Sequence, residues 1–302
     1  MTLIELVHAQ SARLESAGVC FGQGTTNAFD EAAWLVLWAL GLPLDALDGH
    51  ATRELTPAER ERAEALVAQR IATRRPAAYL TGEAWLQGVP FFVDQRTIVP
   101  RSFIAELICD ADGAGTLDAW LGADTRRVLD LCTGNGSLAV LAALAWPAVE
   151  VDAADLSADA LAVAARNVER HGLRGRVRLV RCDLFAALPG RYDLIVCNPP
   201  YVNARSMAAL PPEFRAEPAL ALDGNVAGGA DGMDLVRRIL REAPAHLHDE
   251  AVLVLEIGHE REHFERAFPR LEAVWLPVSA GDEQVLLLTR EALARAAAEA
   301  AP

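Results

Sequence analysis

The sequence predicts an α/β protein in which a helical domain precedes a doubly wound parallel sheet. From Arg126 onward, apolar runs with strand composition alternate with helical segments, and their near-continuous hydrophobicity is typical of strands buried on both faces of a parallel sheet. Residues 1–80 have helical composition, and a segment with β-branched and aromatic residues joins the two parts. We therefore expect a helical domain over residues 1–80, a bridging β-hairpin over 81–100 and a domain built on the sheet over 101–302.

Three helices are expected in the N-terminal part. The first covers Leu3–Ala17. The second starts at Asp30 and turns apolar side chains, including Trp38, toward a core. The third starts at Thr56, a capping residue that is followed by a proline in the first helical turn, and it ends before Pro76, which disfavours helical geometry in the residue preceding it.

The expected hairpin lies in AYLTGEAWLQGVPFFVDQRTIVP, where Gly82 and Gly88 interrupt the β-branched and aromatic residues. The expected strands of the sheet are, in order, RVLDLC, VEVDAAD, VRLVRCD, YDLIVCN, AVLVLEIG and QVLLLT. Residues 137–146 and 158–171 have helical composition, and Gly172 is expected to end the second of these helices.

Composition and charge exclude several classes of protein. The chain is 52% hydrophobic and 23% charged, which is typical of a globular protein. The longest apolar stretch, Ala32–Leu44, is shorter than the ~20 residues that cross a bilayer, and no basic segment leads into an apolar run near the N-terminus. We therefore expect no membrane association and a cytoplasmic location.

The net charge of −14, from 28 basic and 42 acidic residues, disfavours extended contact with nucleic acid phosphates and would suit a basic protein partner. The five cysteines are scattered, without a CxxC pair or a Cys/His spacing of the kind that binds metals. We therefore expect neither a metal ion nor direct nucleic acid binding.

A glycine-bearing turn follows the first expected strand of the sheet, in DLCTGNGSLAV over 130–140. Gly134 and Gly136 would let the backbone approach a ligand closely, and the helix that follows offers free N–H groups at its start. A dinucleotide-binding turn would carry glycine where Cys132 stands, so the match to that motif is poor. By itself the motif is equally compatible with a merely tight connection.

Two acidic residues strengthen the case for a nucleoside site. Asp155 ends the second strand of the sheet, where a carboxylate can accept hydrogen bonds from both hydroxyls of a ribose. Asp183 ends the third strand, where it could accept from an adenine amino group or could instead cap a following turn. Polar groups at three successive strand ends together predict a bound nucleoside.

The most specific motif is Asn198-Pro199-Pro200-Tyr201, directly after the apolar strand YDLIVC. Two successive prolines fix the backbone and remove two N–H donors, so the turn is stiff and its carbonyl oxygens stay available. The Asn198 amide oxygen and a main-chain carbonyl could together accept the two hydrogens of a planar NH₂ group, while the Tyr201 ring packs against it. This arrangement would aim the nitrogen lone pair at an electrophilic methyl group.

With this motif the chain resembles the N5-glutamine methyltransferases of the HemK/PrmC/PrmB group, over nearly its whole length. The resemblance also includes Tyr79-Leu80-Thr81-Gly82, Val99-Pro100-Arg101, Glu217-Pro218, Gly229, Asp231 and Gly232. The run FGQGTTNAFDEA, with LGLPLD after it, looks like the PrmB branch, which methylates a glutamine of the third protein of the large ribosomal subunit. Asn135 and Gln23 stand where we would expect other residues.

The resemblance implies a Rossmann-like class I methyltransferase fold, S-adenosylmethionine as cofactor, and direct transfer of its methyl group to the amide nitrogen of a glutamine. It implies that Gly134 and Gly136 approach the cofactor, that Asp155 takes its ribose, that Asp183 takes its adenine end, and that Asp130 orients its amino group. The residues expected at the cofactor are Asp130, Cys132, Thr133, Gly134, Gly136, Asp155, Leu156, Asp183, Leu184 and Asn198, and those expected at the reacting amide are Asn198, Pro199, Pro200 and Tyr201.

Three alternatives remain open at this point. The glutamine could belong to a peptide chain release factor, as in the PrmC branch. Motifs of the same type also occur in enzymes that methylate the amino group of adenine in DNA or RNA, although those need a basic surface. Finally, the chain could bind a ribosomal protein without catalysis. The helical domain would grip the substrate protein in the enzymatic readings.

Overall fold

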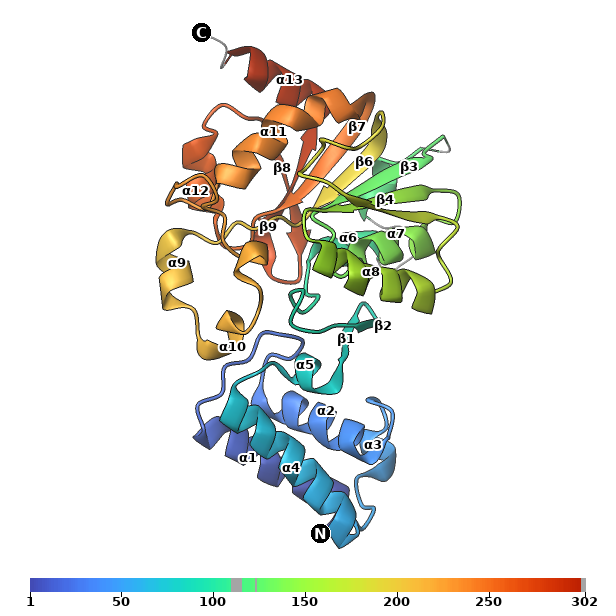
Figure 1. The fold of residues 1–302 in the computed structure, drawn as a ribbon, viewed down its shortest axis with the longest axis vertical. Helices are drawn as coiled ribbons and strands as arrows, with labels where there is room; N and C mark the ends of the chain where they lie inside the picture. The colour runs from blue at the N-terminus through green and yellow to red at the C-terminus, as the bar shows by residue number, and fades with distance from the viewer. Residues whose placement is uncertain (110–115, 123, 300–302) are drawn as a thin grey trace.

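The computed structural model describes residues 1–109, 116–122 and 124–299. A helical unit lies at one end of the molecule and a sheet with helices on both faces at the other, with a small hairpin between them (Figure 1). The helices of the first unit are α1 (Leu3–Ser16), α2 (Ala28–Leu40), α3 (Leu47–His50), α4 (Pro57–Thr73) and α5 (Ala77–Thr81). The hairpin pairs β1 (Glu83–Leu86) with β2 (Val89–Phe92) in antiparallel register.

The helices of the first unit begin and end where local chemistry predicts. The side chains of Thr2 and Thr56 each accept a hydrogen bond from the main-chain N–H of the glutamate three positions later. The side chain of that glutamate accepts one from the main-chain N–H of the threonine, so free N–H groups at the starts of α1 and α4 are satisfied. Helix α2 begins two residues before the expected Asp30, because Asn27 caps it. One prediction is wrong: Trp38 is 43% exposed on α2 and lies outside the core.

The large sheet has seven strands in the order β5-β4-β3-β6-β7-β9-β8. The first five in that order run parallel. At one edge, β9 pairs antiparallel with both β7 and β8. The strands are β3 (Arg127–Leu131), β4 (Glu150–Asp155), β5 (Val177–Arg181), β6 (Tyr192–Cys197), β7 (Leu247–Glu256), β8 (Val274–Val278) and β9 (Gly281–Thr289). All six predicted strands are present, but the last one is antiparallel, and β8 was not predicted.

Two hydrophobic cores cover the two faces of the sheet. Helices α6 (Ile104–Ile108), α7 (Ser137–Ala145) and α8 (Ala158–Arg170) pack on one face, and α11 (Asp234–His246), α12 (Arg261–Ala267) and α13 (Arg290–Glu299) on the other (Figure 1). A short 3-10 turn, Thr116–Ala119, precedes β3. Among the described residues, no helix is both long and apolar enough to cross a membrane.

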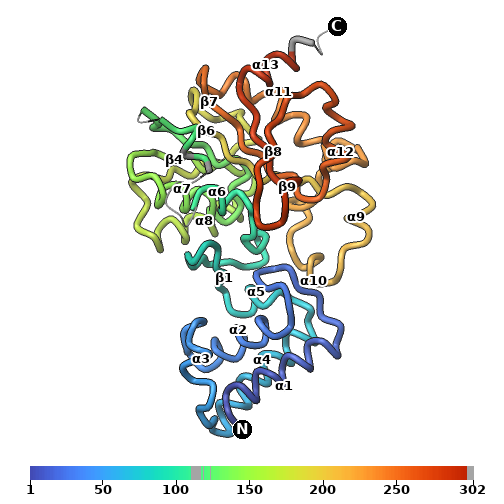
Figure 2. Tube along the Cα trace, turned by 180° about the vertical axis from the view of Figure 1, so that it is seen from behind, coloured from blue at the N-terminus to red at the C-terminus, as the bar shows by residue number. Residues whose placement is uncertain are grey.

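The strand order places the site. The chain moves outward from β3 through β4 to β5 and then returns to the other side of β3 with β6, so the order reverses between β3 and β6. Ligands of open α/β sheets bind at the carboxyl ends of strands at such a reversal. The segment after β6, residues 198–233, carries α9 (Ala204–Ala209), α10 (Pro212–Arg215) and a 3-10 turn (Ala219–Ala221) and extends toward the helical unit (Figure 2).

Candidate active site

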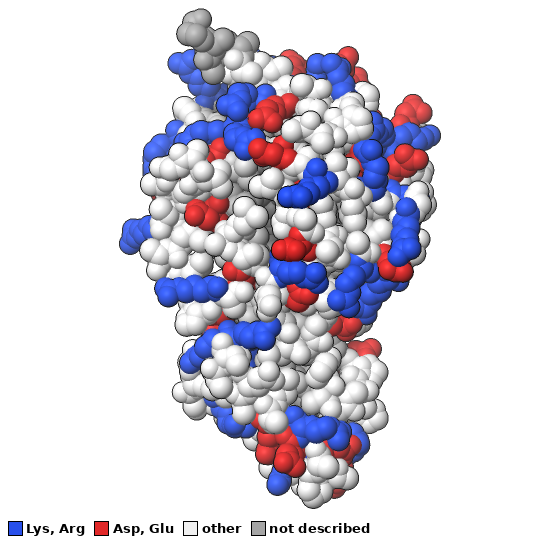
Figure 3. Space-filling view, viewed as in Figure 1, with Lys and Arg blue, Asp and Glu red and all other residues white. Residues whose placement is uncertain are grey.

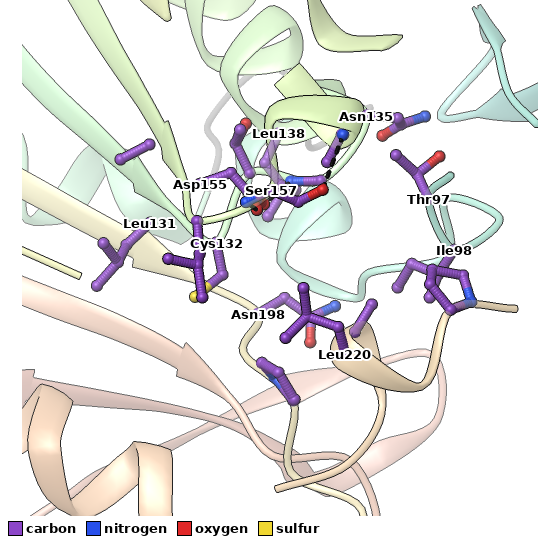
Figure 4. Close-up of a pocket in the computed structure, with 18 of the residues that line it drawn as sticks. Thr97, Ile98, Leu131, Cys132, Asn135, Leu138, Asp155, Ser157, Asn198 and Leu220 are labelled. Atoms are coloured by element: carbon purple, nitrogen blue, oxygen red, sulfur yellow. Dashed lines mark hydrogen bonds between the residues drawn. The ribbon is translucent and has the colours of Figure 1, made fainter. Parts of the chain in front are cut away.

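A pocket of about 230 Å³ opens at the reversal point. Figure 4 shows Cys132, Asp155 and Ser157 on the side of the glycine turn, and Asn198 and Leu220 opposite them. Nine of the predicted residues line the pocket, namely Cys132, Thr133, Gly134, Asp155, Leu156, Asp183, Leu184, Asn198 and Pro200. The structure thus brings together residues from four strand ends.

The turn after β3 is held in place by hydrogen bonds to the end of β4. The Thr133 N–H donates to the carbonyl of Ala154 on β4 at 2.9 Å. Cys132 and Gly134 have φ values of +62° and +57°, so the turn is left-handed at both positions, including the non-glycine Cys132. The Gly134 N–H donates to Asp155 Oδ2 at 2.9 Å, which ties the turn to the end of β4.

Asp130, which was expected to orient the amino group of the cofactor directly or through water, is buried beneath the turn and is not among the residues that line the pocket. Its Oδ2 accepts hydrogen bonds from the Thr133 hydroxyl and, at 2.9 Å, from the Ala139 N–H in the first turn of α7. Burial raises the pKa of Asp130 to about 7, against the lowering effect of these two bonds. Its buried Oδ1 has no partner among the described residues.

Gly136 also differs from its expected role. It lies just before α7 with φ +80°, and it does not line the pocket. A Cβ atom there would lie 3.1 Å from the Cβ of Ala164 and 3.3 Å from its Cα. The absence of a side chain therefore allows the turn to pack against α8, so this glycine serves helix packing rather than approach to the ligand.

The two other predicted acids differ in their surroundings. Asp155 accepts from the Gly134 N–H with Oδ2 and from the Ser157 N–H with Oδ1 at 2.8 Å, and burial raises its pKa. The side chain of Asp183 is 52% exposed and forms an ion pair with Arg238 of α11 at 3.0 Å. Asp155 is therefore a fixed acceptor, whereas Asp183 sits at the outer rim of the pocket together with an arginine.

The Asn198–Tyr201 motif separates two cavities. Asn198 lines both the pocket and an adjoining groove of about 570 Å³. Pro200 lines the pocket alone, while Pro199 and Tyr201 line the groove alone. The motif therefore does not act as one surface: its asparagine stands where the two cavities meet.

The Tyr201 ring is fitted against the end of β7. Gly258 has φ +52°, and a Cβ atom there would lie 2.7 Å from Tyr201 Cε2 and 2.8 Å from its hydroxyl oxygen. The ring can occupy this position only because residue 258 is glycine. Burial raises the pKa of Tyr201 further above neutral pH.

The groove lies between the two units of the molecule. From the helical unit and hairpin it is lined by residues 22, 24–26, Trp85 and Leu86, and from the sheet domain by Phe103, Leu210, Phe214 and Leu222 among others. Its lining is largely apolar, with polar groups at Glu256, His259 and Gln284. Such a groove suits a segment of another protein better than a small ion.

Several site residues were not assigned a role from the sequence. Arg101 lines both cavities and donates to both carboxylate oxygens of Glu217, at 2.6 and 2.8 Å. The buried Glu256 accepts from the Ser102 hydroxyl and, at 2.9 Å, from the Phe103 N–H. Burial raises the pKa of Glu256 to about 7. The only signal in the sequence for the contact between Arg101 and Glu217 was that both belong to motifs of the resemblance, Val99-Pro100-Arg101 and Glu217-Pro218. The two residues are 116 positions apart.

The pocket fits a ligand that carries both an ammonium and a carboxylate, as an amino acid does. In the described part of the chain, three buried polar atoms at or beside it lack a partner: Asp130 Oδ1, Asn135 Nδ2 and Thr97 Oγ1. The first can accept from an ammonium, and the other two can donate to a carboxylate. The described residues contain no group of three or more His, Cys, Asp or Glu side chains that could hold a metal ion.

Two family models match parts of the chain. Residues 112–223 match the model of the methyltransferase small domain, and residues 5–82 match the PrmC N-terminal domain. Among solved structures, a methyltransferase from Pyrococcus furiosus is 18% identical over 75% of this chain and 97% of that one, with a TM-score of 0.46.

Curated relatives extend over almost the full chain. The ribosomal protein uL3 glutamine methyltransferase of Bordetella pertussis is 56% identical over 97% of this chain and 96% of its own. The proteins of the same name from Burkholderia pseudomallei and Neisseria meningitidis are 52% and 47% identical, over 95% and 97% of this chain and 94% of each relative. The resemblance found in the sequence is thereby confirmed, and the chain belongs to the family of the ribosomal protein uL3 glutamine methyltransferases.

Proposed function

We propose that this protein uses S-adenosylmethionine to methylate the side-chain amide of a glutamine in the large-subunit ribosomal protein uL3. The position of Asn198 is the observation that carries the proposal. Its side chain lines both the pocket, which suits an amino-acid-bearing nucleoside, and the groove, which suits a protein segment. A methyl donor in the first and a glutamine in the second would meet at this residue.

The pocket residues divide the work of holding the cofactor. Asp155, fixed by two backbone N–H groups, takes the ribose hydroxyls, and Asp183 with Leu184 borders the adenine end. Asp130 Oδ1 accepts from the amino group at the methionine end, directly or through a water. Cys132, Thr133, Gly134 and Leu156 complete the lining.

S-adenosylmethionine, when bound, supplies a methyl group that is electrophilic because it is attached to a positively charged sulfur. An amide nitrogen is a poor nucleophile, because its lone pair is delocalised into the carbonyl. The Asn198 amide oxygen and the Pro199 carbonyl accept the two N–H groups of the glutamine and orient the lone pair. Orientation of this kind can contribute up to ~7–11 kcal/mol to lowering the barrier.

The same two acceptors stabilise the positive charge that develops on nitrogen in the transition state. Tyr201, seated against Gly258, packs beside the planar amide and keeps water away from it. The methylated amide carries an excess proton that is strongly acidic and can pass to water. The chemistry therefore requires no buried base and no metal ion.

The substrate protein is proposed to be gripped by the helical unit, residues 1–80, because its residues 22 and 24–26 line the groove. A ribosomal protein as partner supports a cytoplasmic location for the reaction. Arginine and acidic side chains are interspersed on the face seen in Figure 3, and this face offers no continuous basic surface of the kind that nucleic acid substrates need. This supports a protein substrate over an adenine in DNA or RNA.

The test is to incubate the enzyme and labelled S-adenosylmethionine separately with purified uL3, a release factor and ribosomal RNA. We expect label in uL3 alone. Label only in the release factor would keep the chemistry but overturn the choice of substrate. Label only in RNA would overturn the glutamine chemistry, and binding of uL3 without transfer would indicate a non-catalytic assembly role.

A further inference from the structure

A network of four charged side chains, three of them buried, fixes one wall of the groove. The wall is the loop of residues 20–26, called here the wall loop, of which residues 22 and 24–26 line the groove. The network consists of Glu31 on α2, Arg70 on α4, Arg74 directly after α4, and Glu213 on α10, and is called here the clasp. The side chains of Glu31, Arg70 and Glu213 are each only 1% exposed.

The clasp holds the wall loop at both ends. At the first end, the Cys20 N–H donates to Glu213 Oε1 at 3.2 Å, and the Cys20 carbonyl accepts from Arg70 Nη2 at 3.0 Å. At the other end, the Thr25 hydroxyl donates to Glu31 Oε2 at 3.2 Å. Between them the loop closes on itself, because the Gly22 N–H donates to the Thr25 carbonyl at 2.7 Å.

In the clasp, Arg70 lies between the two glutamates, and Arg74 pairs with one of them. Arg70 Nε lies 2.8 Å from Glu31 Oε1, and Arg70 Nη1 lies 3.7 Å from Glu213 Oε1. Arg74 Nη1 lies 3.1 Å from the same Glu213 oxygen. Two carboxylates thus face two guanidinium groups, and loss of one partner would leave a buried charge uncompensated.

Glu213 belongs to the segment that follows the Asn198–Tyr201 motif, not to the helical unit. Four residues later in the same segment, Glu217 accepts from the Val99 N–H at 2.9 Å and from Arg101, which also lines the groove. The wall loop and Arg101 are therefore both fastened to one short stretch, 213–217. Figures 1 and 2 agree that α10 and the wall loop, which joins α1 to α2, lie side by side.

The wall loop has the chemistry of a surface for peptide backbone. Gly22 and Gly24 have φ values of +114° and +104°, and a Cβ atom at Gly24 would lie 3.1 Å from the Trp34 ring. The loop therefore presents main chain and threonine side chains to the groove. Such a wall recognises an extended protein segment through main-chain hydrogen bonds and leaves room only for small or apolar neighbours of the glutamine.

From these contacts we propose that Glu213 is a positioning residue for substrate recognition: through the clasp it holds the wall loop in the conformation that binds the protein segment around the glutamine. This inference deepens the proposed function and rests on it. Because neither the clasp nor the wall loop lines the cofactor pocket, their disturbance should weaken binding of uL3 while the cofactor affinity is unchanged.

The variants that test this are Glu213→Gln, which keeps the shape but removes one buried charge, and Thr25→Val, which removes only a hydroxyl from the wall loop. The control is Glu64→Gln, whose side chain is 40% exposed on the same helix as Arg70. In full-length enzyme we expect KM for uL3 to rise about tenfold or more in Glu213→Gln and about threefold or more in Thr25→Val, as for lost hydrogen bonds to charged groups. The turnover number at saturating uL3 and the Kd for S-adenosylmethionine should stay within about threefold of the wild type.

Hydrogen–deuterium exchange of residues 20–26 provides a readout that does not depend on activity. It should become about tenfold faster in Glu213→Gln and faster in Thr25→Val, with no change over residues 131–139. Unchanged exchange of the wall loop, or a KM within about twofold of the wild type in both variants, would overturn the inference. Equal losses in KM, turnover and cofactor affinity would overturn it too, because they would indicate a merely structural role.

The two proposals can fail separately. If Glu213→Gln does not fold, Thr25→Val still tests whether the clasp positions the wall loop. We expect this variant to fold, because it leaves every buried charge paired. If the wild-type enzyme transfers no methyl group to uL3, the proposed function fails, and the exchange measurement still shows whether the clasp holds the wall loop.

Discussion

The Gly134 N–H donates to the carboxylate of Asp155 at 2.9 Å, across 21 positions of sequence. This bond connects the glycine turn after β3 with the acid that ends β4, so neither can shift without the other. One oxygen of Asp155 is engaged in the turn and the other accepts from Ser157. Two carboxylate oxygens offer about four lone pairs, so acceptor capacity remains for the two hydroxyls of a ribose.

The first prediction concerns Asp155→Ala. Since a hydrogen bond to a charged group contributes roughly 1.5–3 kcal/mol, the Kd for S-adenosylmethionine should rise by about one to two powers of ten. Calorimetry on the purified enzyme measures this. The matched control is Asp159→Ala, an exposed acid four positions later in the first turn of α8. A change below about twofold in Asp155→Ala would refute the ribose assignment.

Asn198→Ala should separate binding from chemistry. The cofactor affinity should stay within about twofold, while turnover falls at least about a hundredfold, as for loss of one preorganised group at a transition state. Single-turnover transfer to uL3 gives the rate, and calorimetry on the same sample gives the affinity. Retained turnover would show that the amide is not held by this side chain.

Gly258→Ala tests whether the position of the Tyr201 ring matters for activity. The added methyl would lie 2.7 Å from the ring, so the ring must move, and we expect turnover to fall about tenfold or more. Gly172→Ala is a matched control, because Gly172 also has a positive φ, +69°, but no atom lies within 4 Å of the added Cβ. Both variants carry backbone strain, and only the first displaces Tyr201. Equal activities would mean that the ring position does not matter.

A pH dependence follows from Asp130. Its pKa of about 7 in the folded protein lies above the ordinary value of 3.8, so folding takes up a proton between these values. The free energy of unfolding contributed by this group therefore falls as pH rises from about 4 to about 7. Urea unfolding of wild type and Asp130→Asn at pH 5 and 7.5 measures it.

The variant should lose less stability over this range, by about 1 kcal/mol or more, since each pKa unit corresponds to ~1.4 kcal/mol. Glu256, with a pKa also raised to about 7, contributes in the same direction in both proteins and does not affect the difference. An equal loss in the two proteins would show that Asp130 titrates normally.

Local pattern was sufficient for most of the fold. The strands β3, β6 and β7 contain near-continuous apolar stretches because both faces of each are covered by helices. Strand β8 was missed because it is a short edge strand in which only Leu276 is buried, and because Pro277 interrupts it. The antiparallel direction of β9 depends on which strand it meets and has no signature within QVLLLT.

In the site, the sequence indicates which residues lie at strand ends, but not which contacts depend on a distant partner. Asp155 and Asn198 line the cavities because Asp155 ends β4 and Asn198 directly follows β6. Gly136 packs on Ala164 and Asp130 lies under the turn, and neither contact can be read from the spacing within DLCTGNG. The unexpected Asn135 and Gln23 each hold a buried atom that lacks a partner within the described structure, one at the pocket and one in the wall loop.

The most direct test of the central claim is to find the atom that receives the methyl group. Tandem mass spectrometry of uL3 after reaction with wild type and with Asn198→Ala would locate it. We predict a single added methyl on the side-chain nitrogen of one glutamine with the wild type, and none at the same time point with the variant. A methyl group on a lysine, arginine or main-chain nitrogen, or the same glutamine product from both enzymes, would contradict the proposal that Asn198 presents a planar amide to the methyl donor.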